Sequence, residues 1–433
     1  MPSEPLRIAI VGAGPSGATL ARLLQVQSET KGRLQVTVFE RETRLHDRDQ
    51  GGTLDLHDET GLAALKQAGL ADTPAFESIA RWDGDAMVLG DKHMRRWLSL
   101  GSTKDGSWLA QGKPEVDRLQ LRQLLLSSLA EGTVAWGKRI SRVEQDPWDR
   151  TSVLHFEDGT TQGPYDLVIG ADGAYSIVRP LLTDQQPFYS GVGGWNMLCP
   201  NAALNRPLMT RLVNHGSLFA FSDGKVVMGQ QLGSGAIYVS VWAVKPDNWM
   251  TTSGYDVRDP KAVKAALLEE FKDWAPELRE LVASFDETKV WPRSLVMLPT
   301  GLSWETNPGV TLLGDAAHVI CPFVGEGVNA AMGDAIGLAK AISSTVQRGW
   351  NRPLLAESIR TYEKGMRARA YKSATMTEEA MRLMLFTPNA PEATIEKYVV
   401  AVTTNDMPFF AVPVVKLLVK AFYTVYKVVL WWK

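Results

Sequence analysis

One glycine-rich turn near the start of the sequence limits the possible fold more than any other segment. Arg7–Val11 (RIAIV) is almost entirely apolar and predicts a buried parallel strand. Gly12, Gly14 and Gly17 follow at once in GAGPSG, and an apolar helical pattern then runs to Leu24. In such a turn the first glycine allows a tight bend, the second lets the backbone approach a pyrophosphate, and the third lets helix and strand pack closely. The segment predicts a Rossmann-like unit that binds a dinucleotide.

A second predicted strand supports this interpretation. Leu34–Phe39 ends in Glu40, at the position where an acceptor for ribose hydroxyls belongs. A glycine pattern alone is weak, but one between a strand and a helix, with an acid after the second strand, is strong. The sequence contains one such turn, which argues against architectures with a second Rossmann domain for a nicotinamide cofactor.

A distant segment, Gly314–Leu338, is expected to complete the same site. Val310–Leu313 predicts a short buried strand, and Asp315 falls at its carboxyl end. Ligands of open α/β sheets bind just outside the carboxyl ends of the strands, where a carboxylate accepts hydrogen bonds from sugar-like hydroxyls. Gly325–Gly327 (GEG) then opens a helix of small residues, and the amino end of that helix favours negative charge.

Two intermediate segments carry further candidate residues. Gly51–His57 (GGTLDLH) contains Asp55 and leads into an amphipathic helix. Pro114–Leu129 predicts another helix with its leucines directed inward, and it carries Arg118 and Arg122 one turn apart. Arg122 is expected only to pair with a surface acid.

A third parallel strand is predicted at Leu167–Ala171 (LVIGA). It ends in Asp172 and Gly173, and Arg179 follows a few residues later. An isolated ADG is a common turn, so the interpretation depends on the preceding strand and on the spacing to the arginine.

The pattern changes to alternating strands between about residues 187 and 291. Ser217–Phe221, Lys225–Gln231 and Ala236–Val244 are separated by glycine-containing turns, which predicts an antiparallel sheet and hence a second domain. A sheet laid over a cofactor turns one face toward it. The candidates for lining that face are Trp195, Met197, Phe219, Phe221, Tyr238 and Trp242.

Composition excludes several classes of protein. The chain has 433 residues, with 45% hydrophobic and 22% charged, as in ordinary globular proteins of two or three domains. Its net charge of −2 argues against nucleic-acid binding. Two cysteines exclude a disulfide framework or a cysteine-rich metal site and suit a reducing compartment, so no metal is expected. Because the first strand begins by Arg7, we expect no signal peptide. We also expect a cytoplasmic location and a monomer.

These motifs together resemble the single-component, class A (aromatic-hydroxylase-like) flavoprotein monooxygenases. The match runs through Gly314, Asp315, Pro322, Gly325, Gly327, Asn329 and Asp334. GGTLDLH followed by GLAALKQAGL narrows the resemblance to the tetracycline-inactivating branch and its microbial relatives of secondary metabolism. The resemblance implies an α/β fold with a Rossmann-like FAD-binding domain of the GR2 type, an antiparallel substrate domain and C-terminal helices. The implied boundaries are 1–75, 95–186 and 292–375 for the FAD-binding domain, 76–94 and 187–291 for the sheet domain, and 376–433 for the helical segment.

The resemblance also implies cofactors and residue roles. NADPH visits, reduces FAD and leaves, and reduced FAD reacts with O2 to give a C4a-hydroperoxide that hydroxylates or epoxidises the substrate, so no catalytic side chain is required. His318 is interpreted as a turn residue rather than a base. The implied FAD contacts are Gly12, Gly14, Pro15, Ser16, Gly17, Glu40, Arg41, Asp55, Arg118, Asp172, Asp315, Gly325, Gly327, Val328 and Asn329. The implied NADPH contacts are Arg48 and Arg179, and the implied substrate contacts are Asn196, Ser217, Phe219, Tyr238, Pro322 and Phe323.

The substrate region departs from the drug-inactivating enzymes. Their glutamine, arginine and histidine contacts fall on Asn196, Ser217 and Tyr238, so a charged pair is lost and tetracycline is put in doubt. We expect a hydrophobic polycyclic, aromatic or indolic substrate. The alternatives are another flavin enzyme on the same fold (an oxidase, halogenase or reductase) and a non-catalytic flavoprotein that sequesters a hydrophobic ligand. The tryptophan motif of halogenases is absent around Trp195 and Trp291, which lowers that option.

The C-terminal segment 414–433 has four lysines and no acid. Lys416, Lys420 and Lys427 lie on one helical stripe, and the uncharged runs are too short to span a membrane. An amphipathic helix docked on its own protein is the preferred interpretation. Peripheral contact with a membrane through the same helix is the alternative.

Overall fold

The computed structural model describes residues 4–45, 51–84, 86–101, 113–404 and 407–432. Residues 431 and 432 are described by their backbone alone. The chain divides into two compact units. Unit 1 comprises residues 1–81, 113–188 and 296–374, and unit 2 comprises residues 82–112, 189–295 and 375–433. The predicted boundary at residue 95 differs from this division because β5 (Arg96–Leu100) pairs with β4 (Met87–Gly90), which keeps both strands in unit 2.

A five-stranded parallel sheet forms the centre of unit 1. Its order is β17 (Val310–Leu312), β11 (Leu167–Gly170), β1 (Leu6–Val11), β2 (Leu34–Phe39) and β7 (Val134–Ala135). The valine-, isoleucine- and leucine-rich runs of β1 and β11 are buried on both faces, as a sheet covered by helices requires. In register, Val11 lies opposite Phe39 and Gly170, and Gly170 lies opposite Leu312. Four strands therefore end at one edge, where the predicted motifs begin.

Helices and smaller sheets complete unit 1. Its helices include α1 (Pro15–Val26), η1 (Ser28–Thr30), α2 (Gly61–Gln67), α3 (Pro74–Glu77), α4 (Arg118–Ser127), η3 (Arg179–Leu181), α10 (Asp315–His318), η4 (Pro322–Val324) and α11 (Gly327–Gln347). β8 (Ile140–Gln145), β9 (Ser152–Phe156) and β10 (Thr161–Tyr165) form an antiparallel sheet, and β3 (Thr53–Asp55) pairs with β6 (Glu115–Asp117). The helix predicted from Pro114 begins only at Arg118, because the residues before it are drawn into this strand pair.

Unit 2 is organised around a seven-stranded sheet in the order β16 (Val290–Met297), β12 (Phe188–Cys199), β15 (Ile237–Val244), β14 (Lys225–Gln231), β13 (Ser217–Ser222), β4 and β5. The antiparallel pairs β12–β15, β15–β14 and β14–β13 confirm the predicted meander. The short helices of this unit are α5 (Ala202–Asn205), α6 (Pro207–Val213), α7 (Trp249–Thr252), α8 (Pro260–Glu270) and α9 (Pro276–Ala283). Core residues of α6, α8 and α9 cluster with Trp195 and Met197 of β12.

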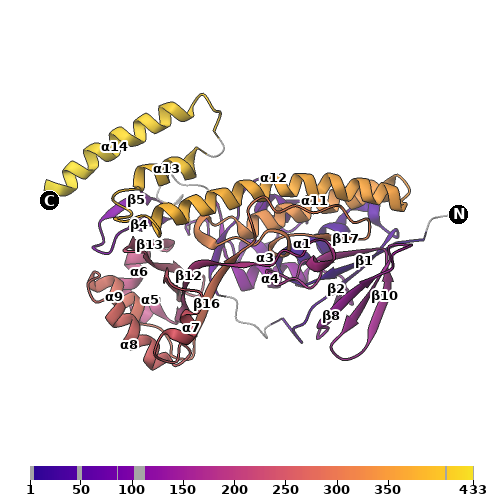
Figure 1. Ribbon diagram of the computed structural model, residues 1–433, viewed down its shortest axis with the longest axis horizontal. Helices are drawn as coiled ribbons and strands as arrows, with labels where there is room; N and C mark the ends of the chain where they lie inside the picture. Colours follow the sequence, from indigo (N-terminus) through magenta and orange to yellow (C-terminus); the bar gives the residue numbers. More distant parts are fainter. Residues whose placement is uncertain (1–3, 46–50, 85, 102–112, 405–406, 433) are drawn as a thin grey trace. The chain divides into compact units, whose positions relative to one another are not determined.

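After α11 the described residues form the helices α12, α13 and α14 (Figure 1). α12 runs from Arg352 to Met384. α13 (Ile395–Thr403) and α14 (Val412–Trp432) pack against each other in unit 2. No helix in the described ranges is long and apolar enough to cross a membrane.

Candidate flavin-binding site

The first glycine turn has the geometry that its sequence predicts. Gly12 has a φ of +106°, and a Cβ there would lie 2.4 Å from the carbonyl oxygen of Ala171. A Cβ on Gly17 would lie 2.1 Å from the carbonyl oxygen of Gly12, so this helix packs too closely on the turn for any side chain. A Cβ on Gly14 would meet nothing within 4 Å. The turn is thus filled by protein on one side and open at Gly14.

The start of α1 is available to an anion. Gly14 is the N-cap residue and offers no side-chain bond, while Pro15 and Ser16 begin the helix. The N–H groups of the first turn of a helix have no intrahelical partner and carry partial positive charge. An open glycine in front of an uncapped helix is the arrangement that accepts a pyrophosphate.

Glu40 is built into the underside of this turn. Its carboxylate accepts hydrogen bonds from the backbone N–H of Ala13, at 2.9 Å, and of Glu42, at 3.0 Å. Arg122 of α4 donates to the carbonyl oxygen of Ala13 at 3.0 Å and to the carboxylate of Glu42 at 2.6 Å, and it lies 3.4 Å from Glu40. The prediction for Arg122 was therefore wrong. It is 1% exposed and braces the turn, whereas Arg41 is exposed.

Asp315 lies at the carboxyl edge of the sheet, immediately after Gly314, whose φ is +61°. Its side chain is exposed, and desolvation by the surrounding protein nonetheless raises the pKa of the carboxyl, against the charges of His318 and Arg118. The charge of Arg118, at the start of α4, acts on the Asp315 carboxyl. These two predicted FAD contacts therefore lie in the same region of unit 1.

Asp334 holds this edge in place from the inside. It is 0% exposed, and its carboxylate accepts hydrogen bonds from the N–H of Gly314 at 3.1 Å, from His318 Nε2 at 2.5 Å and from Arg369 at 3.0 Å. Burial acts to lower the pKa of His318, but the charge of Asp334 and the bond to it outweigh burial and raise that pKa. His318 is thus tied to a buried acid, a role that the sequence pattern did not reveal.

The start of α11 contacts the loop that carries Asp55. The amide of Asn329 donates to the carbonyl oxygen of Asp55 at 2.8 Å and accepts from the N–H of His57 at 2.9 Å. A Cβ on Gly325 would lie 3.4 Å from the Asp55 carboxylate. Desolvation opposes ionisation of Asp55, yet the bond to His57, its charge and that of Lys113 together lower the pKa. Gly327 and Val328 open α11 without a side-chain cap, leaving a second helix start free for negative charge.

The loop after β11 joins the same edge. Asp172 accepts from the N–H of Ile177 at 2.7 Å through one oxygen, while its other oxygen is buried without a protein partner. Arg179 is 0% exposed and donates to the carbonyl oxygens of Ala316 and Gln185, each at 3.1 Å. A direct contact between Arg179 and NADPH, as the sequence predicts, would require this loop to open. Arg48, the other predicted NADPH contact, lies outside the described residues.

The predicted substrate residues of unit 2 share one face of its sheet. Asn196 lies opposite Ser240, which lies opposite Met228, which in turn lies opposite Phe219. Tyr238 and Ser217 have the same parity within their strands, so they belong to this face too, as do Phe221 and Trp242. Trp195 and Met197 point the other way, into the helix-covered core, so the prediction that they line the cofactor-facing side was wrong. In unit 1, Pro322 is exposed on η4, and Phe323 is half-buried.

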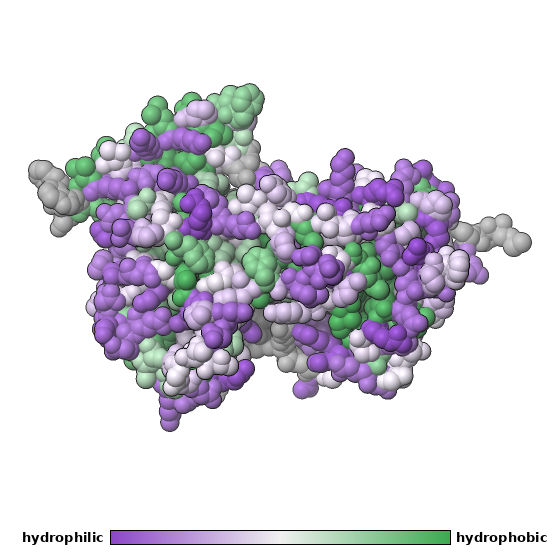
Figure 2. All heavy atoms as spheres, viewed as in Figure 1, coloured by the Kyte–Doolittle hydropathy of each residue, from purple (hydrophilic) through white to green (hydrophobic). Residues whose placement is uncertain are grey.

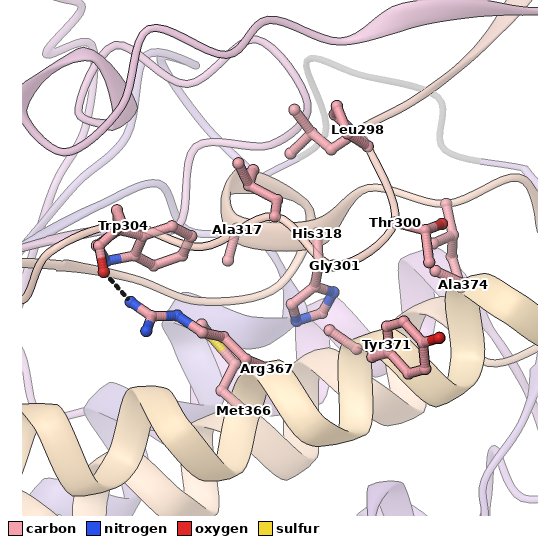
Figure 3. A pocket seen from close by; sticks show the side chains of 14 residues that line it. Leu298, Thr300, Gly301, Trp304, Ala317, His318, Met366, Arg367, Tyr371 and Ala374 are labelled. Carbon is pink, nitrogen blue, oxygen red and sulfur yellow. Dashed lines mark hydrogen bonds between the residues drawn. The ribbon is translucent and has the colours of Figure 1, made fainter.

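A separate pocket lies beside α10 in unit 1 (Figure 3). Its lining includes Trp304, His318, Met366 and Tyr371, and Arg367 closes one side by donating to the carbonyl oxygen of Trp304 at 2.7 Å. None of the predicted FAD contacts lines it. This pocket is therefore distinct from the edge of the sheet where those residues gather.

The residues at the sheet edge fit a bound FAD. The space at Gly14, the two uncapped helix starts and the unpartnered oxygen of Asp172 offer separate positions for phosphate and for hydrogen-bond donors. Within the described residues, no group of three or more His, Cys, Asp or Glu side chains is placed to hold a metal ion.

Comparisons with known proteins show to which family the whole chain is similar. A family model described as an FAD binding domain matches residues 6–377. Monooxygenase penA of Penicillium thymicola is 29% identical over 438 residues, which cover 90% of this chain and 98% of that protein.

Solved structures have a similar fold at low sequence identity. A variant of HpxO from Klebsiella pneumoniae, complexed with FAD, has a TM-score of 0.70 at 21% identity and covers 95% of this chain and 97% of its own. Tetracycline destructase Tet(51) has a TM-score of 0.67 at 17% identity and covers 93% and 97%. At these identities the likeness concerns the fold alone.

Proposed function

The chain belongs to the FAD-binding-domain family and is an FAD-dependent monooxygenase, and we propose that it oxidises NADPH while transferring one atom of O2 to a hydrophobic polycyclic, aromatic or indolic molecule. The product is a hydroxylated or epoxidised compound. The second oxygen atom leaves as water, with two electrons supplied by NADPH. FAD, when bound, supplies the electron transfer and the activation of O2.

The observation that carries this proposal is the meeting of distant motifs at one sheet edge. Glu40, Asp172 and Asp315 follow three parallel strands that end in register, and two uncapped helix starts belong to the same unit. In this arrangement Gly14 and the start of α1 would hold the pyrophosphate, and Asp315 would accept from the ribityl hydroxyls. The start of α11 would stabilise negative charge on the flavin.

NADPH is proposed as a transient reductant. The single glycine turn is assigned to FAD, which leaves no second Rossmann site for a resident nicotinamide cofactor. Arg48 and Arg179 remain the proposed contacts for NADPH.

The substrate class follows from the face that carries Asn196, Phe219 and Tyr238. In the described strands β12 to β15, charged side chains are absent from the central positions of this face, which carries aromatic, aliphatic and polar uncharged residues. The side-chain oxygen of Asn196 is buried and has no protein partner. A hydrophobic ring system with one O–H or N–H group would satisfy that oxygen and bury its apolar surface.

The test begins with the purified protein. FAD absorbance should be present, and NADPH consumption should rise when phenolic, indolic or polycyclic compounds are added. Products formed under isotopically labelled dioxygen should carry one labelled oxygen atom. Consumption that yields only hydrogen peroxide with every compound would favour an oxidase, and FAD binding without NADPH consumption would favour a ligand-sequestering protein.

Two variants localise the sites. Asp315→Ala should lose FAD markedly, and unchanged flavin content would show that the site is misplaced. Asn196→Leu should keep FAD and basal NADPH oxidation but weaken the response to a hydrogen-bonding substrate by raising its KM. Exposed Asn248→Leu in the same unit is the matched control.

A further inference from the structure

Helix α14 presents an apolar stripe to the outside of unit 2. The outer stripe of α14 consists of seven residues that are each between 46% and 69% exposed: Val414, Leu417, Leu418, Phe422, Val425, Val428 and Val429. Figure 2 shows apolar surface over the region that Figure 1 labels α14. The spacing of three and four residues keeps them on one side of an α-helix for about 20 Å, at 1.5 Å per residue.

The opposite side of the helix is held by its own unit. Tyr423 is 2% exposed, and its hydroxyl donates to the carbonyl oxygen of Trp97 at 2.7 Å. Tyr426 donates to the carbonyl oxygen of Arg96, and Lys427 pairs with Glu396 of α13 at 2.7 Å. These bonds confirm the expectation that α14 docks on the protein. They also fix the rotation of α14 about its own axis, so the outer stripe faces outward and does not pack into the core of unit 2.

Charge on α14 is of one sign. Lys416 and Lys420 are exposed on the helical stripe that also carries Lys427, on a different side of α14 from the outer stripe, and the helix contains no acidic residue. In the described residues neither of these two lysines forms a salt bridge within 4 Å. A helix with an exposed apolar side and only positive charges elsewhere matches a surface that is apolar inside and negatively charged outside, because a lysine can extend its ammonium group toward anionic headgroups.

We propose that the outer stripe of α14 binds the surface of an anionic lipid bilayer, with the helix lying in the interface. Phe409 and Phe410, which are 88% and 70% exposed just before the helix, extend the apolar surface. A contiguous exposed apolar face of this kind marks an interaction site. Pairing of two α14 helices through their stripes is less favourable, since it would join two helices that each carry only positive charge, with no acid on either to neutralise it.

Vesicle binding by the full chain tests the proposal. The protein should float with vesicles of equal parts phosphatidylcholine and phosphatidylserine, and float much less with phosphatidylcholine alone or at high salt. The double variant Leu418→Glu with Val425→Glu should remain with the soluble fraction. Both residues are exposed, so flavin content and thermal unfolding should match those of the unchanged protein.

The matched control places the same charges on other exposed apolar residues of unit 2. Leu204 and Leu208 are 83% and 64% exposed, and Leu204→Glu with Leu208→Glu should float as the unchanged protein does. Lys416→Gln with Lys420→Gln should weaken binding several-fold and flatten its dependence on salt. The proposal is overturned if the unchanged protein does not float, or if the α14 double variant floats equally well. A dimer in solution that the α14 variant dissociates, without vesicle binding, would assign the stripe to a second copy instead.

Discussion

Asn329 joins two segments of the flavin edge that lie far apart in the sequence. Its side chain bonds both to the carbonyl oxygen of Asp55 and to the N–H of His57. Asn329 is 1% exposed, so water does not replace these bonds when they are lost. The amide serves both backbone groups at once because it carries a donor and an acceptor.

Asn329→Ala should therefore destabilise the protein and weaken FAD binding together. Two part-buried backbone groups would lose their partners, each at a cost of roughly 1–3 kcal/mol. Thermal unfolding with and without FAD would measure both effects, and Asn248→Ala on the surface should leave both unchanged. A variant with normal stability and normal FAD affinity would show that the bonds from Asn329 to the Asp55 loop contribute neither to stability nor to FAD binding.

Two glycines of the first turn should fail in different ways. Gly14→Ala adds a methyl group where nothing lies within 4 Å, so the apoprotein should fold with unchanged stability but bind FAD poorly. Gly17→Ala places a methyl group 2.1 Å from a backbone oxygen, so the folded protein itself should be lost or strongly destabilised. Flavin content and circular dichroism on heating distinguish the two results. Full FAD binding by Gly14→Ala would contradict the assigned pyrophosphate position.

Arg122→Met should be among the most damaging single changes outside the glycines. Removing this buried cation leaves Glu40 and Glu42 without their charged partner, a loss of about 3–5 kcal/mol in comparable buried pairs. Urea unfolding should show it, and adding Glu42→Gln should recover part of the stability. Arg139→Met, at an exposed surface pair, is the control and should change stability by less than about 1 kcal/mol. Equal effects of the two methionine variants would remove Arg122 from its bracing role.

Glu115 should make stability depend on pH. Burial raises its pKa from 4.5 to about 8, against the charge of Arg81. Between these values the unfolded chain releases the proton that the folded protein keeps, so stability should fall as the pH rises from about 5 to about 8 and then level off. Thermal unfolding of Glu115→Gln should lack that slope, whereas exposed Glu157→Gln should retain it. A parallel decline in Glu115→Gln and the unchanged protein would assign the pH dependence to other groups.

Local sequence was sufficient where structure depends on neighbouring residues. The apolar runs before Gly12, Asp172 and Asp315 predicted buried strands, and Gly12 and Gly17 marked positions where no side chain fits. The helix predicted over Pro114–Leu129 was wrong at its start for the opposite reason. Glu115–Asp117 becomes a strand because Thr53–Asp55 lies beside it, and in the pairing of Thr53 with Asp117 that partner is 64 residues away in the sequence.

Orientation was likewise beyond local patterns. Alternation within β12 shows that Trp195 and Asn196 point to opposite faces, but only the pairing with β15 and the helices on one side decide which of them is in the core. Arg118 and Arg122 are one helical turn apart on α4, and this spacing does not reveal that Arg122 points toward the first glycine turn while Arg118 acts on the region of Asp315.

By itself, then, the sequence determined the parallel sheet, its glycine turns, the acids at the strand ends and the family to which the chain belongs, because each depends on a short run of residues with a defined period. Tertiary structure alone decided that Asn329 bonds to the Asp55 loop, that Arg122 and Asp334 are buried braces, and that the apolar stripe of α14 faces outward. Those features depend on contacts between residues distant in sequence, and burial converts such contacts into large energies that no local pattern records.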